Sequence, residues 1–206
     1  MQNRQNYARH ETTSAAKIAA ILCLLAGLTA LAACQSHSEP TIGHGGPAPT
    51  FQATTVDGRS IAFPEDFTDG PTVVLMWSTW CPYCKVLMPR LSEIKADYRS
   101  QGLQILAINA KERGYGDPAL YVQEAGFDFL TIADGDLIAD KFDVEYLPGV
   151  FVVSSGGDIA YRRGWTELPA GQSVADLWEE QIRSILEELA DMQNSAKEDR
   201  SARNAY

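Results

Sequence analysis

Two cysteines separated by two residues are the part of the sequence with the clearest chemistry. Cys81 and Cys84 lie in residues 77–84, which read Trp-Ser-Thr-Trp-Cys-Pro-Tyr-Cys. An apolar run at 72–76 precedes the pair and a helix-like segment at 85–101 follows it, so the pair is expected where a strand leads into a helix. Free N–H groups and the positive end of the helix dipole stabilise a thiolate there, which predicts a lowered pKa and a nucleophilic role for Cys81. Cys84, one turn further on, is then placed to attack a mixed disulfide on Cys81.

A zinc site and a purely structural disulfide are the alternatives to redox chemistry. A zinc site needs two more ligands at similar spacing. The other cysteines and all the histidines lie far upstream, at Cys23, Cys34, His10, His37 and His44. A structural disulfide stays open, although so short a loop at a helix start is an awkward place for one. The interpretation that fits best is a redox-active pair with no metal and no cofactor.

The N-terminus has the pattern of a secretory signal peptide. Residues 1–17 are basic, and residues 18–33 are apolar with small residues near the end. The ending Leu-Ala-Ala-Cys resembles the lipobox of bacterial lipoproteins, so we expect cleavage before Cys34 and a lipid on its sulfur; an uncleaved membrane anchor is the alternative. Gln35 follows, which by resemblance to the sorting rule of enteric bacteria permits export to the outer membrane. The chain is therefore expected on the periplasmic side of a bacterial envelope, lipid-anchored to the inner or outer membrane.

The remaining sequence predicts one domain with flexible ends. The whole chain is acidic, with a formal net charge of −10, which argues against a nucleic-acid partner. After the signal peptide at 1–33, residues 34–47 are rich in Ser, Gly, Pro and His and read as a tether. The domain is expected at 48–192, followed by a polar, disordered tail at 193–206.

Strand and helix patterns alternate along the domain. Strands are predicted at 51–55, 59–63, 71–77, 103–109, 127–133 and 159–163, with another after Pro148, and helices at 85–101, 117–125, 137–142 and after Ser173. Asp-Gly at 57–58 predicts a hairpin between the first two strands. The fold class is therefore α/β: a central mixed β-sheet flanked by helices, with an N-terminal β-hairpin extension.

This pattern resembles the thioredoxin fold, and specifically the TlpA/ResA-like family of exported thiol–disulfide oxidoreductases. The resemblance spans residues 48–164 and rests above all on the Trp-Cys-x-x-Cys segment together with Pro148. It implies that Pro148 follows a cis peptide bond and faces the cysteines; a trans proline at a strand start is the alternative. The backbone of Leu147 would then hydrogen-bond a substrate strand, and Trp80 and Tyr83 would complete the substrate-binding surface.

The chain departs from this family at three positions. Leu75 stands where thioredoxin has a buried acid, and Leu87 where ResA-like members carry a glutamate. Without either carboxylate, Cys84 lacks its usual general base. Gly149 replaces a common threonine, which is expected to open space beside the site.

The resemblance implies dithiol–disulfide exchange with substrate proteins, in the direction of reduction, for instance in cytochrome c maturation. A membrane thiol reductant of the DsbD/CcdA kind would then supply electrons. The dipeptide between the cysteines, Pro-Tyr, resembles that of glutaredoxins and suggests a potential of roughly −200 to −230 mV rather than about −270 mV. The rivals are a peroxiredoxin-like thiol peroxidase, for which Ser78 fits but Val74 replaces the proline, and a non-enzymatic envelope binding lipoprotein.

Overall fold

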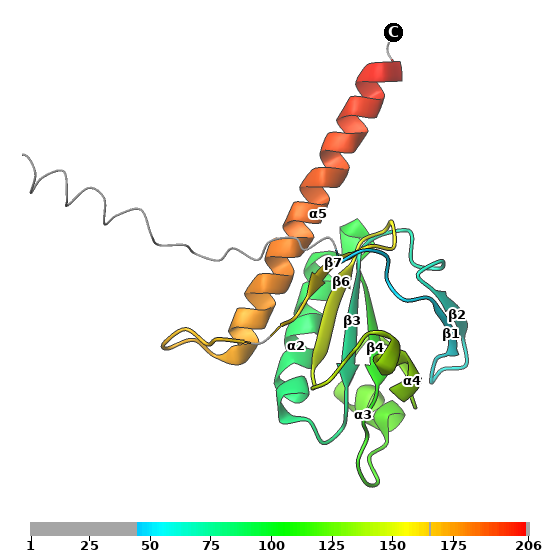
Figure 1. The fold of residues 1–206 in the computed structure, drawn as a ribbon, viewed down its shortest axis with the longest axis vertical. Coiled ribbons are helices and arrows are strands. Elements are labelled where there is room, and N and C mark those ends of the chain that lie inside the picture. The colour runs from blue at the N-terminus through cyan, green and yellow to red at the C-terminus, as the bar shows by residue number, and fades with distance from the viewer. Residues whose placement is uncertain (1–44, 165, 205–206) are drawn as a thin grey trace, which may run out of the picture. The chain divides into compact units, whose positions relative to one another are not determined.

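A five-stranded mixed sheet forms the centre of the domain (Figure 1). The structure is a computed structural model that describes residues 45–164 and 166–204. The elements are β1 (Phe51–Thr54), β2 (Ser60–Phe63), β3 (Thr72–Trp77), α2 (Pro82–Asp97), η1 (Arg99–Gln101), β4 (Gln104–Asn109), α3 (Pro118–Ala125), β5 (Leu130–Ile132), α4 (Asp136–Lys141), β6 (Gly149–Val153), β7 (Ile159–Arg162) and α5 (Val174–Asn204). The sheet order is β5-β4-β3-β6-β7, with β3, β4 and β5 parallel and with β6 and β7 added antiparallel. Strands β1 and β2 form a separate hairpin, so the predicted fold class is confirmed.

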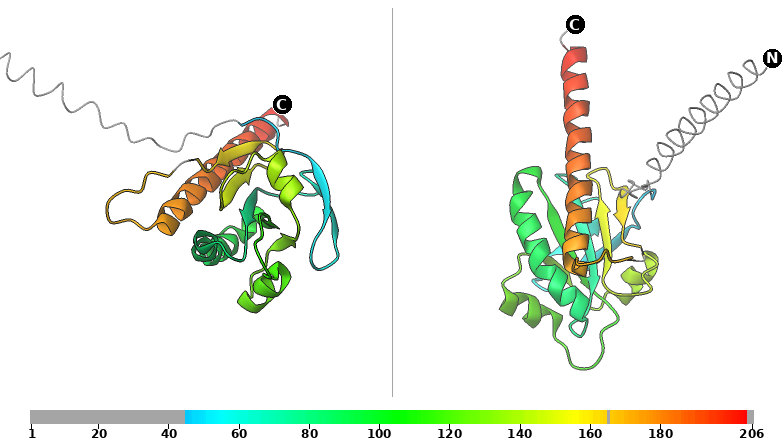
Figure 2. Two further views of the ribbon diagram at one scale, coloured as in Figure 1. Left: turned by 60° about the horizontal axis from the view of Figure 1, so that its bottom comes forward. Right: turned by 90° about the vertical axis from the view of Figure 1, so that its left-hand side faces the viewer.

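Strand β3 is buried on both faces, as its continuous apolar sequence predicts. Because successive side chains alternate between faces, Val73, Leu75 and Trp77 join one core cluster while Val74 and Met76 join the other. The first cluster contains residues of α2, α3 and α5; the second contains residues of α4 and the β1–β2 hairpin. Figure 2 shows α2 and α5 on one side of the sheet and the hairpin on the other.

Local capping signals place the helix ends where the sequence predicts them. The carboxylate of Asp117 accepts the Leu120 N–H at 3.0 Å at the start of α3, and Gly126 ends that helix with φ 69°. The Ser173 hydroxyl likewise accepts the Asp176 N–H at 3.2 Å. The helix expected over 85–101 is divided, since α2 ends at Asp97 and a short 3-10 turn completes it.

Helix α5 is longer than the sequence suggested. Its first half carries the expected apolar stripe, buried at Trp178, Ile182, Ile185, Leu186 and Leu189. Residues 193–204 were expected to belong to a disordered tail, but α5 continues to Asn204 and extends past the sheet (Figures 1 and 2). This stretch is rich in Ala, Lys, Glu and Arg, which have high helix propensity, so a helix already anchored by packing continues into solvent.

The N-terminal predictions concern residues that the structure does not describe. Neither the signal peptide nor Cys34 lies within the described ranges. Over residues 45–164 and 166–204, no helix is both long and apolar enough to cross a membrane.

Candidate active site

The cysteine pair lies at the start of α2 and forms a disulfide. Cys81 is the N-cap residue with an extended backbone, and Pro82 occupies the first helical turn. The Cys84 N–H donates to the Cys81 sulfur at 3.2 Å, and the two Cα atoms are 5.3 Å apart. Cys81 therefore lies at the helix N-terminus with its sulfur directed at a free backbone donor, which is the arrangement that the sequence predicts.

The surroundings of the disulfide in the core are apolar. Leu75 and Leu87 are fully buried in the same cluster as both cysteines. Neither position supplies a carboxylate, so Cys84 has no acid–base partner there. Trp77 is also fully buried, with its ring 5.4 Å from that of Tyr121, and therefore belongs to the core rather than to the surface around the sulfurs.

The segment before β6 reaches the same end of the sheet. Met76 pairs with Gly149 in the antiparallel register, so Leu147 and Pro148 lie opposite the end of β3 that leads to Cys81. The Leu147–Pro148 peptide bond is cis, which confirms what the resemblance implied.

Gly149 does not open space beside the site, and this expectation was wrong. A Cβ atom at Gly149 would lie 2.9 Å from Val144 Cγ1 and 3.1 Å from Met76 Cβ. The room left by the missing side chain is filled by Val144, so the glycine is required by close packing.

The loop after β4 holds the segment that precedes Cys81, a relationship that was not predicted from the sequence. Glu112 accepts the Thr79 main-chain N–H at 2.9 Å, the Thr79 hydroxyl at 2.6 Å and the Asn109 side-chain amide at 2.7 Å. Burial alone would raise the pKa of Glu112, but these hydrogen bonds outweigh it and hold the pKa below its usual value. Glu112 is therefore an ionised anchor for Thr79.

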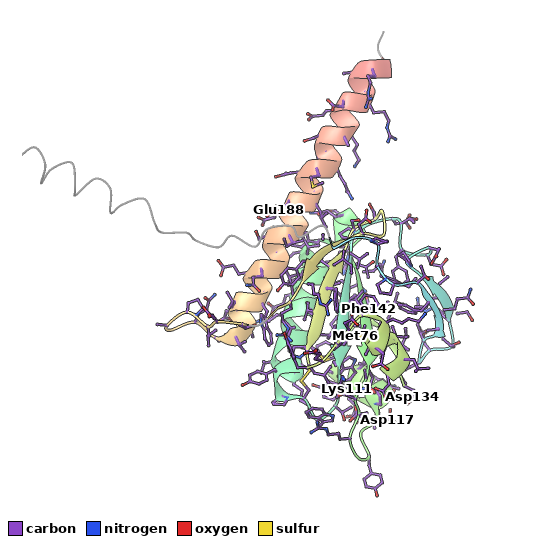
Figure 3. The ribbon with its side chains drawn as sticks, viewed as in Figure 1. Met76, Lys111, Asp117, Asp134, Phe142 and Glu188 are labelled. Carbon is purple, nitrogen blue, oxygen red and sulfur yellow. A yellow bond between two sulfur atoms is a disulfide. The ribbon has the colours of Figure 1, made fainter. Side chains whose placement is uncertain are left out.

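The residues on either side of Thr79 are held by the same loop. The Ser78 hydroxyl donates to the Ala110 carbonyl, and the Trp80 indole donates to the Lys111 carbonyl at 2.8 Å. The Arg113 guanidinium lies 4.1 Å from the centre of the Trp80 ring, a cation–π contact. Figure 3 labels Lys111, whose main-chain N–H donates to the Asp136 carboxylate. The sequence offered one signal: polar Asn109 ends β4 and Glu112 follows three residues later. The carboxyl ends of parallel strands meet at one edge of a sheet, where such side chains can reach the cysteine segment.

Exposed aromatic rings surround the site. Trp80 and Tyr83 are 37% and 55% exposed, as expected of a contact surface. Tyr83 also touches α5, with its ring 6.3 Å from that of Trp178. The structure thus brings the predicted site residues together at one end of the sheet: Cys81, Cys84, Leu147, Pro148, Trp80 and Tyr83. In the described residues, no cluster of His, Cys, Asp and Glu side chains has a composition that would hold a metal ion.

A redox-active cysteine pair at a helix start, opposite a cis-proline on this sheet, defines a thiol–disulfide oxidoreductase of the thioredoxin fold. The chain belongs to the AhpC/TSA family, whose pattern matches residues 44–162. It is 28% identical over 149 residues to the thiol-disulfide oxidoreductase ResA of Geobacillus kaustophilus, a match covering 69% of this chain and 82% of that protein. It is also 28% identical over 150 residues to the thiol:disulfide interchange protein DsbE of Escherichia coli, covering 71% and 75%.

Solved structures support the fold. A putative thiol:disulfide interchange protein DsbE from Chlorobium tepidum superposes with a TM-score of 0.58 at 22% identity, covering 71% of this chain and 99% of that one. The thioredoxin domain of a thiol-disulfide oxidoreductase from Bacteroides vulgatus gives 0.56 at 16% identity, with 71% and 99% covered. The chain is therefore an enzyme that exchanges a dithiol and a disulfide through its cysteine pair.

Proposed function

We propose that this protein reduces disulfides in substrate proteins on the periplasmic side of a bacterial envelope. The observation that carries the proposal is the Cys81–Cys84 disulfide at the N-terminus of α2, opposite the cis Leu147–Pro148 bond. Reduction rather than oxidation is the direction that the TlpA/ResA-like resemblance favours. The signal-like N-terminus and the lipobox-like sequence at Cys34 support export and lipid anchoring to the inner or outer membrane.

Two exchange steps transfer two electrons to the substrate. The Cys81 thiolate attacks one sulfur of the substrate disulfide, that S–S bond breaks, and the other substrate sulfur leaves as a thiolate. The Cys84 thiolate then attacks the Cys81 sulfur, which forms the intramolecular disulfide and releases the second substrate thiolate. Because Leu75 and Leu87 are apolar and buried, the Cys84 proton passes to water or to the departing thiolate. A membrane thiol reductant of the DsbD/CcdA kind restores the dithiol.

The substrate chain is proposed to lie against four residues at the edge of the site. An extended segment pairs with the backbone of Leu147 beside Pro148, as added strands do at exposed sheet edges. The exposed rings of Trp80 and Tyr83 cover the substrate cysteine and limit water around the reacting sulfurs. This surface suits an unfolded or flexible polypeptide that presents a cysteine.

Trapping in the host tests the function and identifies the substrates. The Cys84→Ala variant is expected to accumulate mixed disulfides on Cys81 that a thiol reductant dissolves, and a Cys81→Ser, Cys84→Ala variant is the control that should trap nothing. Trapped proteins that remain oxidised in a strain lacking this protein support reduction; proteins that remain reduced there point to oxidation. Absence of any trapped protein, with insulin reduction unaffected by Cys81→Ser, would contradict the proposal.

The rival activities have less support in the structure. Ser78 is fully buried and its hydroxyl donates to the Ala110 carbonyl, so it does not face an incoming peroxide as a thiol peroxidase requires. Rapid peroxide consumption by the purified protein would overturn that argument. Full physiological activity of a variant lacking both cysteines would favour a binding lipoprotein.

A further inference from the structure

Arg163, the residue after β7, makes a contact that an ordinary strand pair does not have. Its main-chain N–H donates to the Val150 carbonyl at 2.8 Å, in continuation of the β6–β7 ladder. If the ladder continued, the next acceptor would lie two residues before Val150, at Pro148, the residue that precedes β6. The side chain of Arg163 reaches this carbonyl, because Nε donates to it at 2.8 Å and Nη2 donates to it as well. The guanidinium thus donates to the carbonyl that comes next along the ladder.

Two aromatic rings contact the guanidinium of Arg163. Its central carbon lies 4.9 Å from the ring of Tyr146 and 4.9 Å from the ring of Trp178. No carboxylate of residues 45–164 or 166–204 forms an ion pair with Arg163, although the side chain is half-buried. Its polar contacts are therefore with main-chain carbonyls, chiefly that of Pro148.

These contacts connect the cis-proline segment with the aromatic rings beside the cysteines. Tyr146 directly precedes Leu147, whose backbone is the proposed pairing edge. Trp178 lies on α5, and its ring contacts that of Tyr83, which lies between the two cysteines in the sequence. Arg163 therefore connects the cis-proline segment with this helix through polar contacts, so loss of its two donors should loosen the pairing edge without altering the sulfurs.

We propose that Arg163 is a positioning residue for polypeptide substrates, which holds the Leu147–Pro148 edge in place for strand pairing. The inference rests on the proposed function, because it assigns a role within the same site. A polypeptide needs the edge to align its disulfide, whereas a small disulfide reaches Cys81 without it. Loss of Arg163 should therefore raise KM for polypeptides and leave small-molecule exchange unchanged.

The adjacent residue offers a matched control. Arg162, the last residue of β7, is also an arginine. Its side chain donates to the Asp143 main-chain carbonyl at 2.8 Å, and its guanidinium carbon lies 5.5 Å from the centre of the Phe151 ring. It makes no contact with Pro148 among the described hydrogen bonds. Arg163→Gln, Arg163→Lys and Arg162→Gln are compared with the wild-type protein on insulin and on 2-hydroxyethyl disulfide.

The expected result is a split between the two substrates. Arg163→Gln should raise KM for insulin by up to about tenfold, with kcat within about twofold. Loss of a charged hydrogen bond that orders the edge lowers the population of the binding-competent edge by up to about a decade, and the apparent affinity falls by the same factor. Arg163→Lys, which keeps the charge but lacks the fork, should recover only part of the loss. Arg162→Gln should match wild type, and 2-hydroxyethyl disulfide should be reduced equally by all four proteins.

Three results would overturn the inference. These are an unchanged KM for insulin in Arg163→Gln, an equal loss on both substrates, and the same KM rise in Arg162→Gln. If Arg163→Gln does not fold, Arg163→Lys is judged by the same criterion. A higher KM for insulin alone supports the inference, and an unchanged KM for insulin overturns it. A wild-type protein that reduces neither substrate would overturn the proposed function and this inference together, which separates that failure from a defect of the Arg163 variants alone.

Discussion

Glu112 holds Thr79 through both donors of that residue, the main-chain N–H at 2.9 Å and the hydroxyl at 2.6 Å. Thr79 lies two residues before Cys81, so a carboxylate from the loop after β4 orients the segment that leads to Cys81. The two residues are 33 positions apart in sequence. The redox site therefore has a polar support that the cysteine motif itself does not contain.

Replacing this anchor should weaken the domain. Glu112→Gln removes a charged acceptor of four hydrogen bonds, two from Thr79 and one each from Asn109 and Arg113, and is expected to lower the free energy of unfolding by about 1–3 kcal/mol. Urea denaturation measures the change. Glu93→Gln, at an exposed position on α2, is the control and should change stability by less than about 0.5 kcal/mol. Equal effects of the two substitutions would show that the contacts to Thr79 and Asn109 contribute nothing.

The same carboxylate should make stability depend on acid pH. Burial works to raise the pKa of Glu112, but the hydrogen bonds from Thr79 and Asn109 bring it below the ordinary value of 4.5. A lowered folded-state pKa gives a contribution that is present above 4.5 and is lost as the pH falls through the folded value. The stability difference between wild type and Glu112→Gln, measured from pH 7 downward, should therefore shrink below pH 4.5. A difference that stays constant into acid would contradict the assignment.

Filling the space at Gly149 should be unfavourable. Gly149→Ala places a Cβ 2.9 Å from Val144 Cγ1 and should cost about 1–3 kcal/mol of stability through overpacking. Gly156→Ala is the matched control, because the nearest atom to a Cβ there, Ser154 Oγ, is 3.6 Å away. Thermal unfolding should separate the two variants, and equal midpoints would argue that Val144 moves aside freely.

Tyr161 should titrate late in alkali. Its hydroxyl donates to the Gln181 side chain at 2.8 Å, and burial raises its pKa to about 12. Because the folded pKa exceeds the unfolded value of 10.0, the neutral phenol contributes stability below that pH and loses it as the pH rises toward 12. Absorbance at about 295 nm should show one tyrosine that ionises near 12, and its absence in Tyr161→Phe identifies the residue. An unchanged titration curve in the variant would contradict the assignment.

Features with local causes were predictable from the sequence. The helix start at Cys81 and Pro82, the cap at Asp117 and the cap at Ser173 each depend on residues within three or four positions. Apolar residues also predicted the strands. Burial on one face of a strand produces alternating apolar and polar residues, and burial on both faces produces a continuous apolar run. The prediction of a disordered tail was wrong for residues 193–204. Their polar composition indicated disorder, but many of them also have high helix propensity, and α5 continues through them.

The sequence alone thus indicated the cysteine pair, its place at a helix start and the sheet that presents it. The tertiary structure decided how the site is supported. Glu112 meets Thr79, Arg163 meets the Pro148 carbonyl, and Val144 fills the space beside Gly149. The first two contacts join residues 33 and 15 positions apart, and they depend on strand order and register, which no local spacing in the chain encodes.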